Sequence, residues 1–432
     1  MGLLNEQTEA KLGFDDIRRL LAGRANTEAG KARFLTLQPL RRPEEVIREL
    51  DRVAECRDLL LYDDSFSLDF TGSVDPLLAH IKVVGSWLPA ADLFKLVKWL
   101  RMVRQLIDYF RVRKEKFPNL WKVVDRLAWE KSLLAQLEKL LDERGNVRDN
   151  ASDKLRSTRR ALVAAGSDLR KMLHSTLRNA VSNGWSEASE ITIRNDRMVI
   201  PIKADFKGRI KGFIHDVSQS GQTIFLEPSS ALEQNNLIRQ LQATEQNEVV
   251  RLLAEAADAI REQLPALRQY IRVVTRMDTV RAKARLAVDL DGQRPIFDPK
   301  GKSMHLVQAR HPLLMLKPGM GKDKVVPLSI AMDEASRIVL VSGPNAGGKS
   351  VTLKTVGLLQ AMLQAGLLVP VDPSSEFRWF GAIYIDIGDE QSIQSDLSTY
   401  TSHLQNMKEM QTALNADALF LMDEFGSGTD PR

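Results

Sequence analysis

The sequence contains little cysteine, no long apolar run and little net charge. Its single cysteine, Cys56, excludes a disulfide framework and any zinc site built from several cysteines, and it favours a reducing compartment. No segment approaches 18 consecutive apolar residues, and the first residues lack the apolar core of a signal peptide. With 61 basic against 56 acidic residues, a nucleic-acid surface would require local clustering of bases. We therefore expect a cytoplasmic protein with no membrane partner.

The hydrophobic periodicity changes twice along the 432 residues, which are long enough for about three domains. Spacings of three and four predict helices, and alternation predicts strands. We expect helices over most of residues 1–183, with Pro43 at a first helical position and long helical tracts at 120–141 and 152–181. Four antiparallel strands should follow over 191–228, with a turn at Asn195-Asp196. Helices should then resume over 229–290, with a break at Pro265. From about residue 295 the pattern becomes α/β, with strands expected at 305–308, 337–341, 382–386 and 418–422.

A glycine-rich loop and a helical segment follow the strand expected at residues 337–341. The loop consists of Gly343, Pro344, Asn345, Ala346, Gly347, Gly348, Lys349 and Ser350, which match the pattern GxxxxGK[ST]. Glycines let successive backbone N–H groups turn toward one anion, and the positive end of the helix dipole adds to the attraction. Lys349 would reach the β and γ phosphates, and Ser350 would place its hydroxyl on Mg²⁺. The loop thus predicts a site for a magnesium-bound nucleoside triphosphate.

A second segment supports this prediction. Residues 418–422 are an apolar run that ends in Asp423 and Glu424, the form of a Walker B strand. Asp423 would hold Mg²⁺, and Glu424 would polarise the attacking water as the catalytic residue. Acids at a strand end are often helix caps or surface residues, but their order after the phosphate loop favours the catalytic interpretation.

The strings GPNAGGKS and DEFGSGTDP resemble the ATPase of the MutS family. RNDRMVIPIKADFKGRIKGFIHDVSQSGQTIFLEP, with EQNNLIRQLQATEQNEVVRLL behind it, resembles more narrowly the bacterial type-two branch. The resemblance implies a multidomain α plus α/β fold, in which a helical core and lever arms carry a small antiparallel β clamp that touches nucleic acid, followed by an ABC-type P-loop ATPase that works as a homodimer. The implied domains are the core and first lever arm (1–183), the clamp (184–228), the returning lever helices (229–294) and the N-terminal part of the ATPase (295–432).

Further site residues follow from the resemblance. Ser398 and Thr399, with Tyr400, resemble the signature that reaches the γ-phosphate held by the other subunit, although the same string could be the first turn of a helix. Gln391 lies where ABC proteins carry a Mg²⁺-sensing glutamine. The family continues beyond the Walker B turn into more strands, a switch histidine, dimerising helices and an Smr nuclease domain. We therefore expect an incomplete ATPase domain that binds ATP but hydrolyses it poorly.

Basic residues gather in two places. Within residues 194–212, six bases face two acids, and we assign them to nucleic-acid binding, with a solvated hairpin as the alternative: Arg194, Arg197, Lys203, Lys207, Arg209 and Lys211. No recognition helix is present to imply base specificity. A further six lie on the helix expected at 152–181, where we interpret them as a solvated face rather than a nucleic-acid surface: Lys154, Arg156, Arg159, Arg160, Arg170 and Lys171.

Two functions fit this resemblance. The first is an ATP-dependent clamp on double-stranded DNA that is branched or a recombination intermediate, which would suppress homologous recombination, with ATP hydrolysis opening and closing the clamp. The alternative is an ATPase that binds ribosomal RNA and splits stalled or collided ribosomes. A transporter subunit is excluded because the LSGGQ signature is absent, and an SMC-like ATPase is excluded because its long helices would lie between the two Walker elements.

Overall fold

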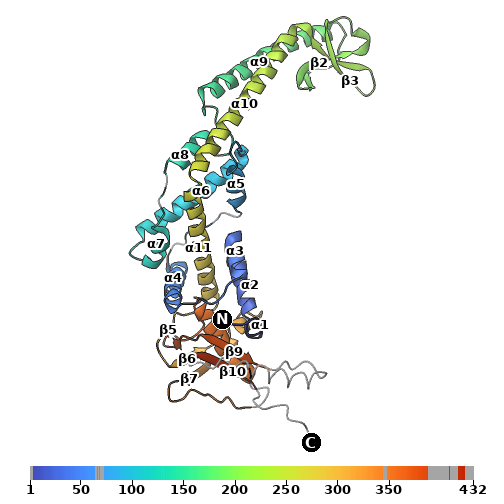
Figure 1. The fold of residues 1–432 in the computed structure, drawn as a ribbon. Helices are drawn as coiled ribbons and strands as arrows, with labels where there is room; N and C mark the ends of the chain where they lie inside the picture. Colours follow the sequence, from blue (N-terminus) through green and yellow to red (C-terminus); the bar gives the residue numbers. More distant parts are fainter. Residues whose placement is uncertain are drawn as a thin grey trace. The chain divides into compact units, whose positions relative to one another are not determined.

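The computed structural model describes residues 3–63, 66, 68, 73–127, 129, 131–343, 348–387, 408 and 417–423 (Figure 1). The chain forms two compact units. Unit 1 joins residues 1–73, 101–129 and 265–432, and unit 2 joins residues 74–100 and 130–264. Throughout the described ranges, no helix combines the length and the apolar character that crossing a membrane requires.

Unit 1 is helical around two small sheets. Its helices are α1 (Glu6–Leu12), α2 (Phe14–Arg24), α3 (Glu28–Leu35), α4 (Pro43–Tyr62), α7 (Pro118–Val124), α11 (Leu264–Asp289), α12 (Pro312–Met315) and α13 (Lys349–Gln364), and α6 (Ala90–Val112) runs through both units. The prediction of Pro43 at a helix start is confirmed, because α4 begins there with proline's preset φ and missing N–H. The α4 residues Val46, Leu50 and Val53 recur at helical spacing and are fully buried.

The strands of unit 1 form a mixed sheet and a parallel pair. The mixed sheet has the order β5 (Ile296–Asp298), β8 (Glu376–Arg378), β6 (Met304–Ala309), β7 (Leu328–Met332), and the pair is β9 (Ala382–Asp386) with β10 (Ala418–Met422). The strands expected at 305–308, 382–386 and 418–422 are confirmed. Helix α13 packs against β10, so the helix behind the glycine-rich loop lies on the strand that precedes Asp423.

Two predicted elements of unit 1 are wrong. Residues 337–341 form no strand, and Ile338 and Leu340 are 91% and 90% exposed. A strand is held by hydrogen bonds to a neighbour, and no described segment pairs with these residues. The helix expected over 120–141 is interrupted between α7 and α8 (Lys131–Leu140), where the ring of Trp129 stacks on Tyr270 with 5.5 Å between centroids. This tertiary contact overrides the local helical pattern.

Unit 2 carries a four-stranded antiparallel sheet on two long helices. Its elements are α5 (Asp75–Ile81), α8 (Lys131–Leu140), α9 (Asp153–Ser182), β1 (Thr192–Arg194), β2 (Arg197–Lys203), β3 (Gly212–Val217), β4 (Thr223–Pro228) and α10 (Leu232–Glu262). Figure 1 shows α9 and α10 running side by side to the sheet. The four predicted strands and the break before Pro265 are confirmed.

The sheet of unit 2, in the order β1-β2-β4-β3, packs on the end of α9. Ile200, Ile202 and Leu226 form one apolar core with the α9 leucines, which include Leu169 and Leu173. The Asn195-Asp196 turn between β1 and β2 has φ angles of 50° and 58°. Both lie in the left-handed region, as a two-residue type I′ hairpin requires, and asparagine and aspartate tolerate that region best after glycine.

A buried ion pair holds the C-terminal end of α13. Lys283 of α11 donates hydrogen bonds of 2.8 Å both to the Glu49 carboxylate of α4 and to the carbonyl of Ala365, just after α13. Burial by itself raises the pKa of Glu49, but Lys283 and Arg276 lower it by more, and the net shift is downward. Gly366 follows with φ of +71°, and a Cβ there would lie 2.2 Å from the Glu49 side chain. Only glycine fits both the backbone angle and this close approach.

The single cysteine gives a simple check of the packing of α4. Cys56 is fully buried, and burial raises the pKa of its thiol to about 12. Because the thiolate is the reactive form, we expect native Cys56 not to react with a disulfide reagent at pH 8 and to react fully in denaturant. Rapid labelling of the native protein, followed by absorbance, would contradict this packing.

Candidate functional sites

The helix α13 begins at the end of the glycine-rich loop. Gly348 is its N-cap and has φ of +84°, and Gly343 has φ of +153°. Both angles are ones that side chains strongly disfavour, so the glycines predicted at these positions have a backbone reason. The first N–H groups of a helix have no internal partners, so the N-terminus of α13 offers donors to an anion. Pro344, Asn345, Ala346 and Gly347 lie outside the described residues.

The structure brings together two predicted residues that are 73 positions apart. The Ser350 hydroxyl donates a hydrogen bond to the Asp423 carboxylate. Asp423 follows β10, and its backbone N–H donates to the carbonyl of Asp386 at the end of β9, at 2.8 Å. Because β9 and β10 are parallel, their carboxyl ends meet at one edge, next to the start of α13. Glu424, Ser398, Thr399 and Gln391 lie outside the described residues.

Three of the six bases predicted to bind nucleic acid have acidic partners inside unit 2. Arg194 lies 3.0 Å from Asp216, and its guanidinium covers the ring of Phe225 at 4.1 Å. Lys203 lies 2.7 Å from Glu187, and this hydrogen bond lowers the pKa of Glu187.

Arg197, the third of these bases, is the most enclosed, with a side chain that is 13% exposed. It donates at 2.6 Å to Glu227, whose carboxylate is 1% exposed. Glu227 also receives a hydrogen bond from Asn235, and it contacts His215 at 2.6 Å. A buried carboxylate needs such partners, so the structure gives Arg197 a role inside the sheet.

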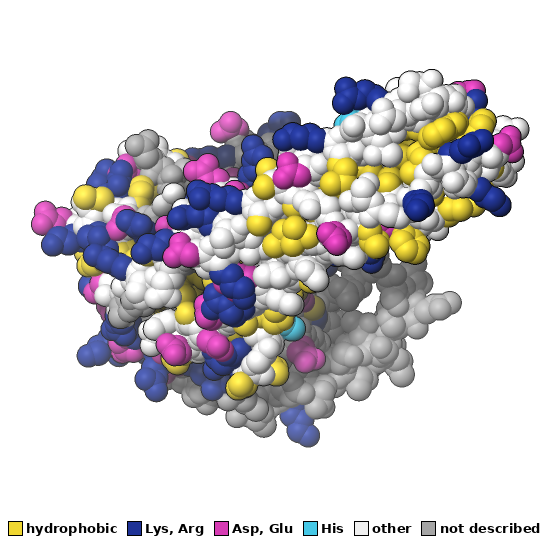
Figure 2. Space-filling view, turned by 90° about the horizontal axis from the view of Figure 1, so that it is seen from above, with side chains coloured by type: hydrophobic (Ala, Val, Ile, Leu, Met, Phe, Trp, Pro, Cys, Tyr) yellow, Lys and Arg dark blue, Asp and Glu magenta, His cyan; other side chains and the backbone are white. Residues whose placement is uncertain are grey.

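The other three bases lie on the loop that leads into β3. Lys207, Arg209 and Lys211 are all exposed, and none of them forms an ion pair with an acid in the described part of unit 2. We call this segment, residues 207–211, the cationic loop. In Figure 2, basic side chains on the visible face are interspersed with acidic ones, whereas hydrophobic side chains gather at the end that holds the sheet. Uncompensated charge is what contact with phosphates would use.

The helical bases match their interpretation as a solvated face. Arg159 contacts both Glu245 and Asp149, Lys154 lies 3.4 Å from Glu248, and Lys171 lies 3.6 Å from Asp168. Glu245 and Glu248 lie on α10, whereas the pair of Lys171 and Asp168 lies within α9.

Known proteins resemble this chain along nearly its whole length. Residues 339–431 match the family model MutS domain V. The chain is 34% identical over 423 residues to Endonuclease MutS2 of Geobacillus sp. strain WCH70, covering 98% of this chain and 53% of that protein. It is 33% identical over 430 residues to Endonuclease MutS2 of Carboxydothermus hydrogenoformans (99% and 54%) and 35% over 434 residues to that of Listeria innocua (99% and 54%). The chain belongs to the MutS family. These relatives place it on the MutS2 branch, as its resemblance predicted, and it spans about half of their length.

One residue that positions the MutS-type loop was not predicted from the sequence. Gly357 lies in the middle of α13, and a Cβ at this position would come within 2.6 Å of both Leu12 and Leu421. The missing side chain lets α13 approach α1 and β10 closely, which brings Ser350 to Asp423. The sequence did offer a signal for this role, namely a glycine inside a strongly apolar helix. Glycine destabilises a helix, so its presence there indicates close packing against a neighbour.

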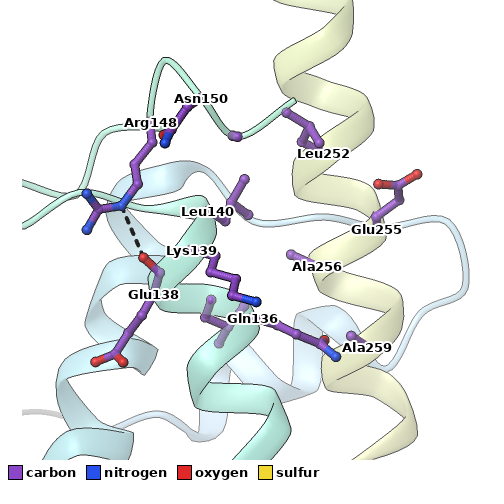
Figure 3. Close-up of a pocket in the computed structure, with 12 residues that line it drawn as sticks. Gln136, Glu138, Lys139, Leu140, Arg148, Asn150, Leu252, Glu255, Ala256 and Ala259 are labelled. Carbon is purple, nitrogen blue, oxygen red and sulfur yellow. Dashed lines mark hydrogen bonds between the residues drawn. The ribbon is translucent and has the colours of Figure 1, made fainter. Parts of the chain in front are cut away.

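A cavity of about 640 Å³ lies elsewhere in this MutS-family chain, in unit 2. It is lined by α8, the loop at residues 148–151 and α10 (Figure 3). Arg148 closes one side by donating a 3.1 Å hydrogen bond to the carbonyl of Glu138, and Leu252 and Ala256 line the α10 side. None of the residues predicted from the sequence lines this cavity.

Proposed function

We propose that this chain binds ATP with Mg²⁺ and couples it to a clamp on branched or recombination-intermediate DNA, so that the complete protein suppresses homologous recombination. The observation that carries the proposal is the contact between Ser350 and Asp423. A hydroxyl at the helix start and a carboxylate at the neighbouring strand end are the oxygen ligands that Mg²⁺ takes together with nucleotide phosphates. The resemblance to MutS2 proteins over nearly the whole chain supports the same function.

Each residue of the nucleotide site has a distinct task. Ser350 and Asp423 would hold Mg²⁺, which when bound would supply positive charge beside the phosphates. Lys349 would pair with the same phosphates, and the backbone N–H groups from Gly343 to Gly348 would surround them. Glu424 would orient and deprotonate the attacking water. In a homodimer, Ser398 and Thr399 would reach the nucleotide bound by the other subunit.

The cationic loop supports a nucleic-acid partner without a base preference of its own. Lys207, Arg209 and Lys211 can each neutralise a phosphate, and phosphate contacts position a protein without reading sequence. Ribosomal RNA carries the same phosphates, so a direct competition must decide between the two targets.

The test uses the purified chain and a labelled four-way DNA junction at fixed salt. We expect unlabelled junction to displace the label at lower concentration than ribosomes do. We also expect Mg²⁺-ATP to raise the thermal melting temperature and to change the junction Kd about five-fold or more, the usual size of coupling between two sites. If Mg²⁺-ATP changes neither the melting temperature nor the affinity for DNA, the proposal is contradicted. Ribosomes that displace the junction more effectively than DNA does would favour the translational function.

A further inference from the structure

The strand β3 exposes large apolar side chains on both of its faces. Phe213, Ile214 and Val217 are 55%, 48% and 50% exposed, although each lies in a paired strand. The register places Phe213 opposite Glu227, whereas Ile214 lies opposite Leu226 of the apolar core. By alternation, Phe213 therefore projects from the opposite face to Ile214. Val217 lies opposite Ile224 of the same core, so Phe213 is the exposed apolar residue on its own face of β3, and each face exposes apolar area that a partner could cover.

Features of β3 itself argue against a second strand as that partner. β3 is the edge strand of the sheet, but its pairing with β4 shifts register between Ile214 and Asp216. Such bulges twist an edge away from regular pairing and protect it from strand addition. The charge of the cationic loop selects a polyanion instead.

Phe213 is the β3 side chain best suited to contact a base. The ring of Phe225 on β4 is covered by Arg194, whereas in the described part of the chain no ring or cation stacks on Phe213. Lys211 precedes it by two residues, about 7 Å along an extended chain. That spacing lets the lysine hold a phosphate while the ring meets a nearby base.

Gly212 keeps this short segment against the sheet. A Cβ at Gly212 would lie 2.2 Å from the carbonyl oxygen of Glu227, so any side chain would push the segment off β4. Lys211 is held in the same way, because its carbonyl accepts a 2.9 Å hydrogen bond from the Ser229 N–H. The cation and the ring are thus presented from a fixed backbone, which limits the ordering that binding requires.

We propose that Phe213 stacks on an unpaired or unstacked base at a DNA branch point, and that this contact makes the clamp prefer branched DNA to uninterrupted duplex. The inference rests on the proposed function and names the feature of DNA that the clamp would recognise. In continuous duplex every base is stacked on its neighbours, so the ring finds no open base face, whereas the bases that flank the branch point of an open junction lack a stacking neighbour on one side. One base stacked on an aromatic ring contributes about 1–3 kcal/mol.

The experiment compares a four-way junction with linear duplex of the same length, by anisotropy over a range of salt. We expect the intact chain to bind the junction about ten-fold more tightly, the factor that about 1.4 kcal/mol gives. Phe213→Ala should remove most of this preference without changing the slope of log K against log salt. Phe213→Trp should retain the preference. The fluorescence of a 2-aminopurine placed at the branch should be quenched by the intact chain and by Phe213→Trp, but not by Phe213→Ala.

Val217→Ala is the matched control, because it shortens an apolar side chain of similar exposure on the same strand and should keep the preference. A preference unchanged in Phe213→Ala, or equal binding of junction and duplex by the intact chain, overturns this inference and leaves the proposed function standing. Absence of binding to either DNA contradicts the proposed function itself. Anionic phospholipid vesicles that displace the junction would show that the apolar strand meets a membrane surface, and would overturn the inference.

Discussion

Replacing Lys207, Arg209 and Lys211 together with glutamine is expected to make DNA binding much weaker and much less sensitive to salt. Each phosphate neutralised contributes about 0.9 to the slope of log K against log salt, so losing three contacts should reduce that slope by about 2.7. Extrapolated from 1 M to 0.1 M salt, the same relation gives a loss of about 500-fold in affinity. The measurement is a series of binding isotherms from low to high salt, using linear duplex.

The control for this variant removes the same charge from another face of unit 2. Arg160, Arg170 and Arg178 are exposed on α9, and their joint replacement with glutamine should leave the salt slope close to that of the intact chain. Equal losses in both triple variants would mean that total charge, and not the cationic loop, governs binding. An unchanged slope in the first variant would remove the cationic loop from the site.

Lys349→Ala is expected to abolish the stabilisation that Mg²⁺-ATP confers on the chain. A ligand at one hundred times its Kd stabilises the folded state by about 2.7 kcal/mol, and the lysine at the start of α13 is the only side-chain cation of the phosphate pattern. Thermal melting with and without Mg²⁺-ATP measures the effect. The intact chain should melt at a higher temperature with the nucleotide, and the variant should melt at the same temperature in both conditions.

A second lysine on the same helix provides the comparison. Lys354 lies one and a half turns further along α13, outside the phosphate pattern, so Lys354→Ala should keep the nucleotide-dependent shift. Asp423→Asn should keep part of the shift and lose its dependence on Mg²⁺, because the amide cannot replace the carboxylate charge beside Ser350. A full shift in Lys349→Ala would refute the assignment of this loop to triphosphate binding.

Local patterns were sufficient to predict the elements whose neighbours lie close in sequence. The hairpins of the unit 2 sheet follow from alternation and from two turn residues, Asn195 and Asp196, whose backbone preference is intrinsic. The strands at 382–386 and 418–422 were also predicted, because apolar runs of that length have few other solutions. Residues 337–341 are similarly apolar but form no strand, since strand formation depends on a partner that a local pattern does not contain.

The roles of the basic residues could not be separated from the sequence. Arg194, Arg197 and Lys203 look like the bases of the cationic loop, yet each meets an acid 16 to 30 positions away, such as Asp216 or Glu187. One signal was available. Glu227 ends the apolar run of β4, and a carboxylate placed among buried residues must find a cation. The pairing that follows depends on the strand register, which brings Arg197 alongside it.

The anchoring of α13 by Lys283 has a mechanical consequence. The end of α13 that lies away from the glycine-rich loop contacts residues of α4 and α11. There Lys283 donates hydrogen bonds both to the Glu49 carboxylate and to the main-chain oxygen of Ala365. An axial displacement of α13 must carry Lys283 and Glu49 with it, because leaving either charge alone in a dry interior is strongly unfavourable. We therefore expect that a displacement of α13 at its glycine-rich end would be transmitted to α11 through this ion pair.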